Sequence, residues 1–292
     1  MPSTLPWTLL FTLACAAAAR AGEPFEIRLD RPLKKGAKFT IESHLERVSD
    51  NAMGGPAVKG VITIELKGVI EVTEVDAKGR VARASCKVEK CTTAIDGGAP
   101  VESLPAGHVI ALETKAGKLE VALGKDGIDK RVAELLVRFA PWEGTDDALC
   151  DDAIFGTADK KKEGETWELD GNKIVPRLAL SRKEKLDSAK AKGTAKVGSA
   201  SDVGGVKCLD LEIEVTVPDI ESRGHLAGFK LTDSALTWTI KKTVPQGAAP
   251  SVIVLKDTMD AHQTLKGNMG GGQMTVEFKE NTTRTITLTA MK

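Results

Sequence analysis

Long stretches in which apolar and polar residues alternate one by one constrain the fold of this chain more than any other feature. In 61–75 one face would carry large aliphatic side chains and the other mostly charges and threonine, and 80–95 alternates in the same way after the turn Asp76-Ala77-Lys78-Gly79. A period of two residues predicts β-strands that are buried on one side. We therefore expect a long β-hairpin here. Shorter strands are expected at 25–30, 37–47, 107–114 and 118–123.

The C-terminal third alternates even more regularly. The segments 236–244, 253–265 and 274–288 have apolar residues on one face and mainly Thr and Lys on the other, which predicts a three-stranded antiparallel meander. A strand of about 15 residues extends about 50 Å, far longer than usual, and strands this long have to coil. We expect a curved sheet or a partial barrel, with β-bulges near Gly68 and Glu280.

The middle of the chain has a different period. Apolar residues recur at helical spacing from Ile128 to Phe139, which predicts a helix that ends before Pro141. Thr145 is suited to cap a second, short helix that would have Asp146 and Asp147 in its first turn.

Together these patterns predict a mainly β (α+β) fold. Two β-rich lobes of long curved antiparallel strands, at 22–126 and 157–292, would flank a small helical pair at 127–156. The two lobes would bury their apolar faces against each other and against the helices.

The first 21 residues are typical of an export signal. The segment from Leu5 to Ala19 has no charge and leads into Ala19-Arg20-Ala21, a small-x-small cleavage pattern. No later segment approaches the roughly 20 apolar residues of a transmembrane helix. We expect a chain without a transmembrane helix that is exported to the periplasm or beyond. An alternative is a lipid anchor at Cys15, but Thr12 stands where the lipidation motif usually has leucine.

The charge balance narrows the partners. The chain has 41 Lys and Arg against 41 Asp and Glu, which argues against a nucleic-acid or anionic-membrane partner, since both need a basic footprint. Four cysteines would remain after export: Cys86, Cys91, Cys150 and Cys208. They could form two disulfides, for example Cys86 with Cys208 and Cys91 with Cys150, or remain free as small apolar residues. The sequence leaves both open.

The sequence contains no common catalytic, cofactor-binding or metal-binding signature, so we assign no residue to these roles. His44-Leu45-Glu46 matches only the first part of a zinc-deaminase motif. The remaining histidines, His108, His225 and His262, lie in separate segments, and no spacing supports a shared zinc site. The aspartates of 146–152 could bind calcium, but a solvated acidic helix turn explains them more simply.

Two strand entries resemble each other. Residues 34–42 and 162–170 both have a Gly turn, an aromatic residue three positions later and then apolar and acidic residues, which could reflect a duplication or simply the common chemistry of strand starts. Together with Val72-x-Glu74-Val75-Asp76-x-x-Gly79, they make the chain similar, over roughly 25–290, to an uncharacterised bacterial family of exported β-rich proteins. The resemblance implies a two-lobed fold and no assigned activity. A looser, architectural likeness is to periplasmic lipoprotein-carrier half-barrels.

The function expected from these features is a non-catalytic exported binding or assembly module. An apolar small molecule would lie between the curved sheet and the 128–142 helix, against Leu135, Leu136, Phe139 and Trp142. These four side chains could instead simply fill the core. Another envelope protein is the other partner to consider, and a periplasmic hydrolase with a site assembled from distant strands is the alternative function.

Overall fold

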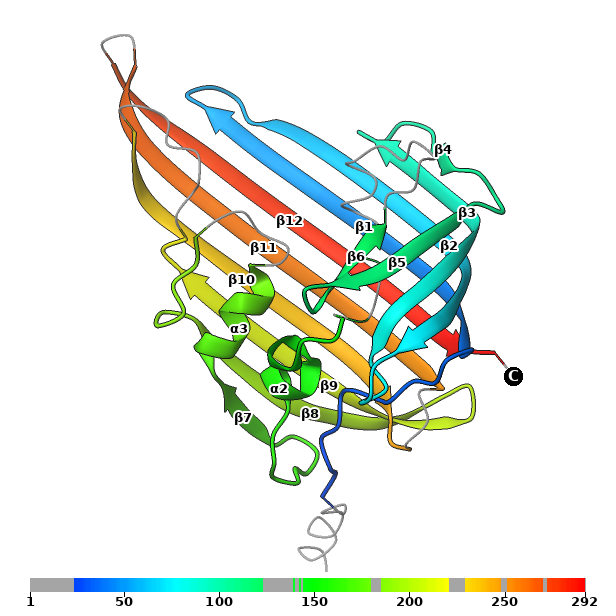
Figure 1. Cartoon of the computed structure of the whole chain (residues 1–292). Coiled ribbons are helices and arrows are strands. Elements are labelled where there is room, and N and C mark those ends of the chain that lie inside the picture. Colours follow the sequence, from blue (N-terminus) through cyan, green and yellow to red (C-terminus); the bar gives the residue numbers. More distant parts are fainter. Residues whose placement is uncertain are drawn as a thin grey trace, which may run out of the picture.

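The fold is a single, open antiparallel sheet of 12 strands, with short helices across one of its faces (Figure 1). The computed structural model describes residues 24–122, 139, 142, 144–179, 185–220, 229–247, 251–269 and 272–291. The order of the strands in the sheet is β6-β5-β3-β2-β1-β12-β11-β10-β9-β8-β7, and β4 pairs with β3 outside this path. The mainly β prediction, with long antiparallel strands in a partial barrel or meander, is confirmed.

The strands are unusually long in the centre of the sheet and short at its edges. Their bounds are β1 Lys38–Met53, β2 Val58–Val75, β3 Val81–Ile95, β4 Val101–Leu104, β5 Val109–Lys115, β6 Lys118–Ala122, β7 Thr166–Leu169, β8 Lys192–Val203, β9 Val206–Pro218, β10 Phe229–Pro245, β11 Val252–Met269 and β12 Gly272–Ala290. The short edge strands β6 and β7 offer few unpaired backbone groups to other chains, which limits edge-to-edge association.

The two β-rich halves of the sequence share this one sheet. β1 and β12 pair along nearly their whole length, from Phe39 opposite Ala290 to Met53 opposite Val276. The predicted 61–95 hairpin is β2–β3, and the predicted C-terminal meander is β10–β11–β12. Pairing of the first strand with the last joins the halves into a continuous surface.

One of the two expected bulges is present. The β2–β3 register shifts at Lys67/Gly68, where a Cβ on Gly68 would lie 2.4 Å from the carbonyl oxygen of Lys87, so that only glycine fits. The bulge expected near Glu280 is wrong. The register of β12 is unbroken there, with Glu280 opposite Ser49 on one side and Ala261 on the other.

The expected strand at 25–30 is also wrong. Residues 24–37, which we call the strap, run extended across the face that carries the helices, and their only strand-like pairing is an isolated bridge between Phe25 and Lys161. The Leu33 amide donates to the carbonyl of Gly79 at 2.7 Å. Ile27 and Leu29 are buried. Most of the strap therefore satisfies its backbone outside the sheet, and only Gly36 and Ala37, at its end, form backbone hydrogen bonds with Val72 of β2.

The helical segment differs from its prediction in detail. A 3₁₀ turn, η2, spans Asp147–Leu149 and is followed by α2, Asp151–Phe155. Asp146 caps η2 in place of Thr145, because its side chain accepts from the Ala148 amide. The helix predicted from Ile128 lies outside the described residues, except for Phe139. Within the described part of the chain, no helix has the length and apolar character needed to cross a membrane.

One described helix was not predicted. α3 spans Gly171–Leu178, and the Asp170 side chain caps it by accepting from the Asn172 amide at 2.9 Å. It is short and contains Pro176, so that its sequence lacks the sustained helical period that a prediction needs.

Two apolar clusters form the core under the helices and loops. The first joins β1, β2, β3 and β5 and includes Leu45, Ile64 and Phe139. The second joins β8, β9 and β10 to α2 and α3 and includes Ile174 and Val215. Leu255 of β11 packs against both clusters.

Candidate ligand-binding face

The two faces of the sheet differ sharply in chemistry. We call the face under the helices the covered face and the opposite one the outer face. Directly paired residues share a face, so the threonines at 283, 285, 287 and 289 of β12 lie on the outer face, opposite the buried Ile286 and Leu288. Exposed ion pairs such as Lys67–Glu42, at 2.9 Å, also lie there. The outer face is a water-facing surface, so a binding site is to be sought on the covered face.

A buried polar seam crosses the covered face between the two apolar clusters. Arg284 donates to both carboxylate oxygens of Asp257, from Nε at 2.9 Å and from Nη2 at 2.6 Å. The Trp238 indole donates to the same carboxylate at 3.2 Å. Two-pronged pairing of this kind is among the stronger polar contacts in proteins. The Asp257 carboxylate is therefore held by three N–H donors and is poorly placed to act on a ligand.

Arg177 of α3 lies at the same seam. Burial, with a smaller effect of the nearby charge of Arg284, lowers the pKa of its guanidinium to about 9, while Asp257 and Asp30 oppose the shift. The side chain is still protonated at neutral pH and adds a positive charge to the seam.

A second buried ion pair joins α2 to the sheet. Lys242 of β10 pairs with Asp151, and both side chains are largely buried. The next residue, Asp152, accepts from the Leu29 amide at 2.5 Å, while its own amide donates to Asp30 at 2.8 Å. Carboxylates of α2 thus tie the helix both to the sheet and to the strap.

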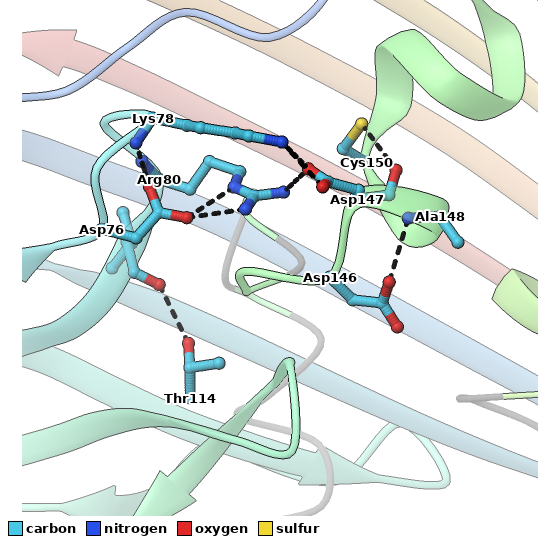
Figure 2. A network of polar contacts seen from close by, with 9 residues as sticks. Asp76, Lys78, Arg80, Thr114, Asp146, Asp147, Ala148 and Cys150 are labelled. Carbon is cyan, nitrogen blue, oxygen red and sulfur yellow. Dashed lines mark hydrogen bonds and ion pairs between the residues drawn. The ribbon is translucent and has the colours of Figure 1, made fainter.

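The segment before α2 is held by a more exposed network (Figure 2). Asp147 accepts from Lys78 Nζ at 2.7 Å and pairs with Arg80, both from the β2–β3 turn. The hydrogen bond from Lys78 is the main cause that holds the pKa of Asp147 below its usual value. The amides of Thr145 and Asp146 donate to the Gly117 carbonyl at 3.0 Å. Acidic residues of 146–152 therefore hold basic side chains and backbone amides, and no described group of three or more His, Cys, Asp or Glu could hold a metal ion.

At the other end of the covered face, apolar side chains are exposed. Met53, Val58, Ile95 and Val101 come from four neighbouring strands and are 57%, 71%, 61% and 68% exposed. The register places all four on the covered face, at the end away from α2. We call these four residues the rim.

Few charges lie next to the rim on this face. Arg47 of β1 and Glu280 of β12 pair with each other at 2.5 Å, and Asp96, which follows Ile95, accepts from the Val61 amide at 2.8 Å. Several exposed apolar side chains towards one end of a face are uncommon on soluble monomers and mark a surface that meets something other than water.

The predicted ligand residues are only partly placed by the structure. Leu135 and Leu136 lie outside the described residues. Phe139 is 1% exposed, and Trp142 meets Phe39 edge to face, with the ring centroids 6.0 Å apart. Both aromatic residues pack in or against the first cluster. The assignment of the four residues to a ligand remains a prediction.

The four cysteines are free thiols in the structure, which corresponds to the second of the two alternatives. Cys86 lies on β3 and Cys208 on β9, and five strands separate them in the sheet, whereas a disulfide needs Cα atoms within about 7 Å. Cys86 and Cys91 are buried in the first cluster, and burial raises the pKa of Cys86 to about 12 and that of Cys91 to about 11. Neither thiol is activated for nucleophilic chemistry.

The histidines do not support the hydrolase alternative. His44 and His262 lie on strands β1 and β11, and His108 precedes β5, while His225 is outside the described residues. His262 meets only the exposed Asp233, at 3.1 Å. In the part of the chain that the structure describes, the histidines thus do not gather into a catalytic group.

No family model and no curated protein matches this sequence. The resemblance to an exported bacterial family therefore remains a prediction.

Solved structures similar to this chain are remote and rich in β-strands. A lipovitellin structure, whose title concerns lipid–protein interactions, is 11% identical, with a TM-score of 0.33; the match covers 86% of this chain but only 25% of that one. An outer membrane channel from Pseudomonas putida F1 is 8% identical, with a TM-score of 0.23 and coverage of 89% and 97%. The outer membrane protein OprG from Pseudomonas aeruginosa is 10% identical, with a TM-score of 0.18 and coverage of 90% and 99%. Likenesses this remote identify no function.

Sequence reasoning missed the rim, although a signal for it exists. Residues 51–58, around the β1–β2 turn, contain no charged residue, and the β3–β4 connection, 96–100, contains only Asp96, in a chain of which 28% is charged. Turns that face water usually carry polar side chains, so an uncharged turn with exposed methionine and valine is unusual. The strand pattern alone could not show that both connections lie at the same end of the sheet.

Proposed function

We propose that this protein is an exported, non-catalytic binding module that holds an apolar molecule against the covered face of its sheet, next to the rim. The observation that carries the proposal is the set of four exposed apolar side chains on a face that is elsewhere buried. A face of this kind is stabilised by covering it with apolar groups, at roughly 25 cal/mol for each Å² removed from water.

The polar groups of the covered face support a binding role over a catalytic one. Asp257 is held by Arg284 and Trp238, and Asp151 by Lys242. A general base or nucleophile needs a free lone pair at the site where a substrate lies. The oxygens of these described carboxylates instead accept hydrogen bonds from structural partners.

The charges near the rim are few, and Asp96 among them accepts from the Val61 amide at 2.8 Å, which favours an uncharged ligand surface. Arg47 and Glu280 neutralise each other at 2.5 Å. Asn51 and Gln263 lie beside Phe278 in register on the same face and offer neutral hydrogen-bonding groups. An acyl chain or another largely hydrocarbon molecule fits this chemistry better than an ionic metabolite does.

Export and domain organisation enter the proposal from the sequence. Residues 1–21 would be removed as a signal peptide, and the strap would begin just after the mature amino terminus. The lobes at 22–126 and 157–292, with the helical segment 127–156, would act as two flanks of one binding face.

Titration of the purified mature protein with an environment-sensitive apolar fluorophore tests the proposal. We expect saturable binding that V58D weakens by about tenfold or more, because a carboxylate would meet the apolar ligand. V109D is the matched control, since Val109 is 55% exposed but lies outside the rim, and it should leave binding unchanged. Non-saturable binding, or equal losses in both variants, would contradict the proposal.

A further inference from the structure

The two ends of the sheet have connections of opposite character. At the end where the rim lies, residues 51–58 and 267–274, around the β1–β2 and β11–β12 turns, contain no charged residue, and the β3–β4 connection, 96–100, contains one, Asp96. At the other end, the β2–β3 turn alone has Asp76, Lys78 and Arg80. The strand registers place the first three connections at one end, since Met53 pairs with Val276 and Ile62 with Ile95.

The β1–β2 and β11–β12 connections lie close to each other. A Cβ on Gly54, in the β1–β2 turn, would lie 3.3 Å from Cγ of Met274, near the start of β12. Residues 53–59 are all exposed, including Pro56 and Ala57. Exposed methionine, proline, alanine and valine thus project together from this end of the sheet.

Basic residues lie directly behind these connections on the outer face. Lys230 of β10 and Lys266 of β11 pair in register, and both are exposed. Thr275 occupies the same row of β12. The next row from the end contains two acidic residues, Glu277, which pairs with Lys279 at 3.2 Å, and Asp233 of β10, which meets His262 at 3.1 Å. The outermost row therefore presents positive charge next to an apolar edge.

We propose that this end of the sheet docks on the surface of a lipid bilayer. Met53, Val58 and Val101 would enter the interface between headgroups and acyl chains, and Lys230 and Lys266 would contact lipid phosphates. Apolar side chains that enter the interface, combined with basic residues behind them, are the features that bind peripheral proteins to membranes.

The inference rests on the proposed function, to which it adds a route for the ligand. Met53, Val58 and Ile95 are part of both the docking edge and the covered face. An acyl chain that leaves the bilayer at this edge could move onto the covered face without passing through water. Because the whole chain carries no net charge, long-range attraction is weak, and docking depends on the local contacts of this edge.

Vesicle flotation of the purified mature protein tests the docking. We expect it to float with vesicles of phosphatidylglycerol and phosphatidylethanolamine, and less with vesicles of phosphatidylcholine alone. K230Q/K266Q should reduce binding to the anionic vesicles on the order of twentyfold, given about fivefold for each basic residue, and 0.5 M salt should reduce binding in the same direction.

The apolar contribution is tested by M53D/V101D, which should lower binding to both vesicle types by about tenfold. V109D, equally exposed but outside the rim, should bind as the unchanged protein does. All these positions are exposed, and circular dichroism with thermal unfolding verifies that the variants fold. The proposal is overturned if the unchanged protein does not float, in which case the edge is a protein-binding surface, or if V109D loses as much binding as M53D/V101D.

The two proposals can fail separately. If the apolar fluorophore binds in solution while the protein ignores vesicles, the docking is wrong and the binding function stands. If the protein floats but never binds the fluorophore, the docking stands and the ligand-binding function is wrong.

Discussion

The two ends of the covered face are built in opposite ways. At the closed end, the strap, α2 and the charged β2–β3 turn are joined by ion pairs and by backbone hydrogen bonds across the sheet. At the open end, the rim exposes four large apolar side chains, and the β1–β2 and β3–β4 connections beside it contain a single charged residue, Asp96. The same long strands run through both ends, so strand pairing does not explain the difference.

The contrast indicates which end contributes stability and which is free for binding. Residues at the closed end have their polar groups satisfied and their apolar groups buried, so changes there should weaken folding. Residues of the rim make few contacts that unfolding would lose, so changes there should weaken binding alone. Stability measurements can therefore separate the two ends.

The largest effect is expected at the buried ion pair of the closed end. D151N leaves the Lys242 ammonium buried beside a neutral amide, which should lower the free energy of unfolding by about 3 kcal/mol. Urea unfolding at pH 7 measures the change.

D147N is the matched control, because Asp147 also pairs with basic residues but its side chain is 65% exposed. Water screens exposed pairs, and its effect on the free energy of unfolding should be much smaller than that of D151N. Equal effects of the two variants would mean that the Asp151–Lys242 pair does not stabilise the closed end more than the exposed pairs of Asp147 do.

The sequence predicted the strands far better than the contacts between distant segments. Alternation from 61 to 95 and from 236 to 288 identified the central hairpin and meander. In a half-buried strand, successive side chains point alternately to the core and to water, so the sequence alternates between apolar and polar residues. The course of the strap at 24–37 was not predicted, because an extended segment has the same local sequence pattern whether it pairs with a strand or with loops.

The candidate site was less accessible to sequence reasoning. The rim arises because β1–β2 and β3–β4 turn at the same end, a fact of the register. The pairing of β1 with β12, which makes the sheet continuous, joins residues more than 200 positions apart along the chain. No local pattern encodes a contact of that range, whereas Gly68 could be expected at a bulge from its place within a strand.

An intermediate effect is expected from the buried thiols of the first cluster. Burial raises the pKa of Cys86 to about 12 and of Cys91 to about 11 from an ordinary 9.0, so the folded state keeps both protons where the unfolded state releases them. The free energy of unfolding should therefore fall as the pH rises above about 9, by about 1 kcal/mol for each thiol at pH 10. Denaturant unfolding at pH 8 and at pH 10 measures the fall.

The variant C86A/C91A isolates this contribution from that of lysines and other groups that titrate at alkaline pH. It should be less stable than the parent at pH 8, because it loses buried volume, yet its stability should fall less between pH 8 and pH 10. A parallel fall in parent and variant would show that these thiols are accessible to water, and the first cluster would then be less tightly closed than the covered face requires.

The smallest effect on the free energy of unfolding is expected at the rim, and it tests directly whether the open end is free of packing contacts. V58T replaces a methyl group that is already in water and should change the free energy of unfolding by no more than about 0.5 kcal/mol. V276T makes the same substitution on β12, where Val276 also lies on the covered face but is 0% exposed. It should lower the free energy of unfolding by about 1 to 2 kcal/mol, because the new hydroxyl is buried among apolar groups. Thermal and urea unfolding of the two variants gives the comparison. If V58T destabilised the protein as much as V276T, Val58 would be packed in solution, and the rim would not be available to a ligand or to a membrane.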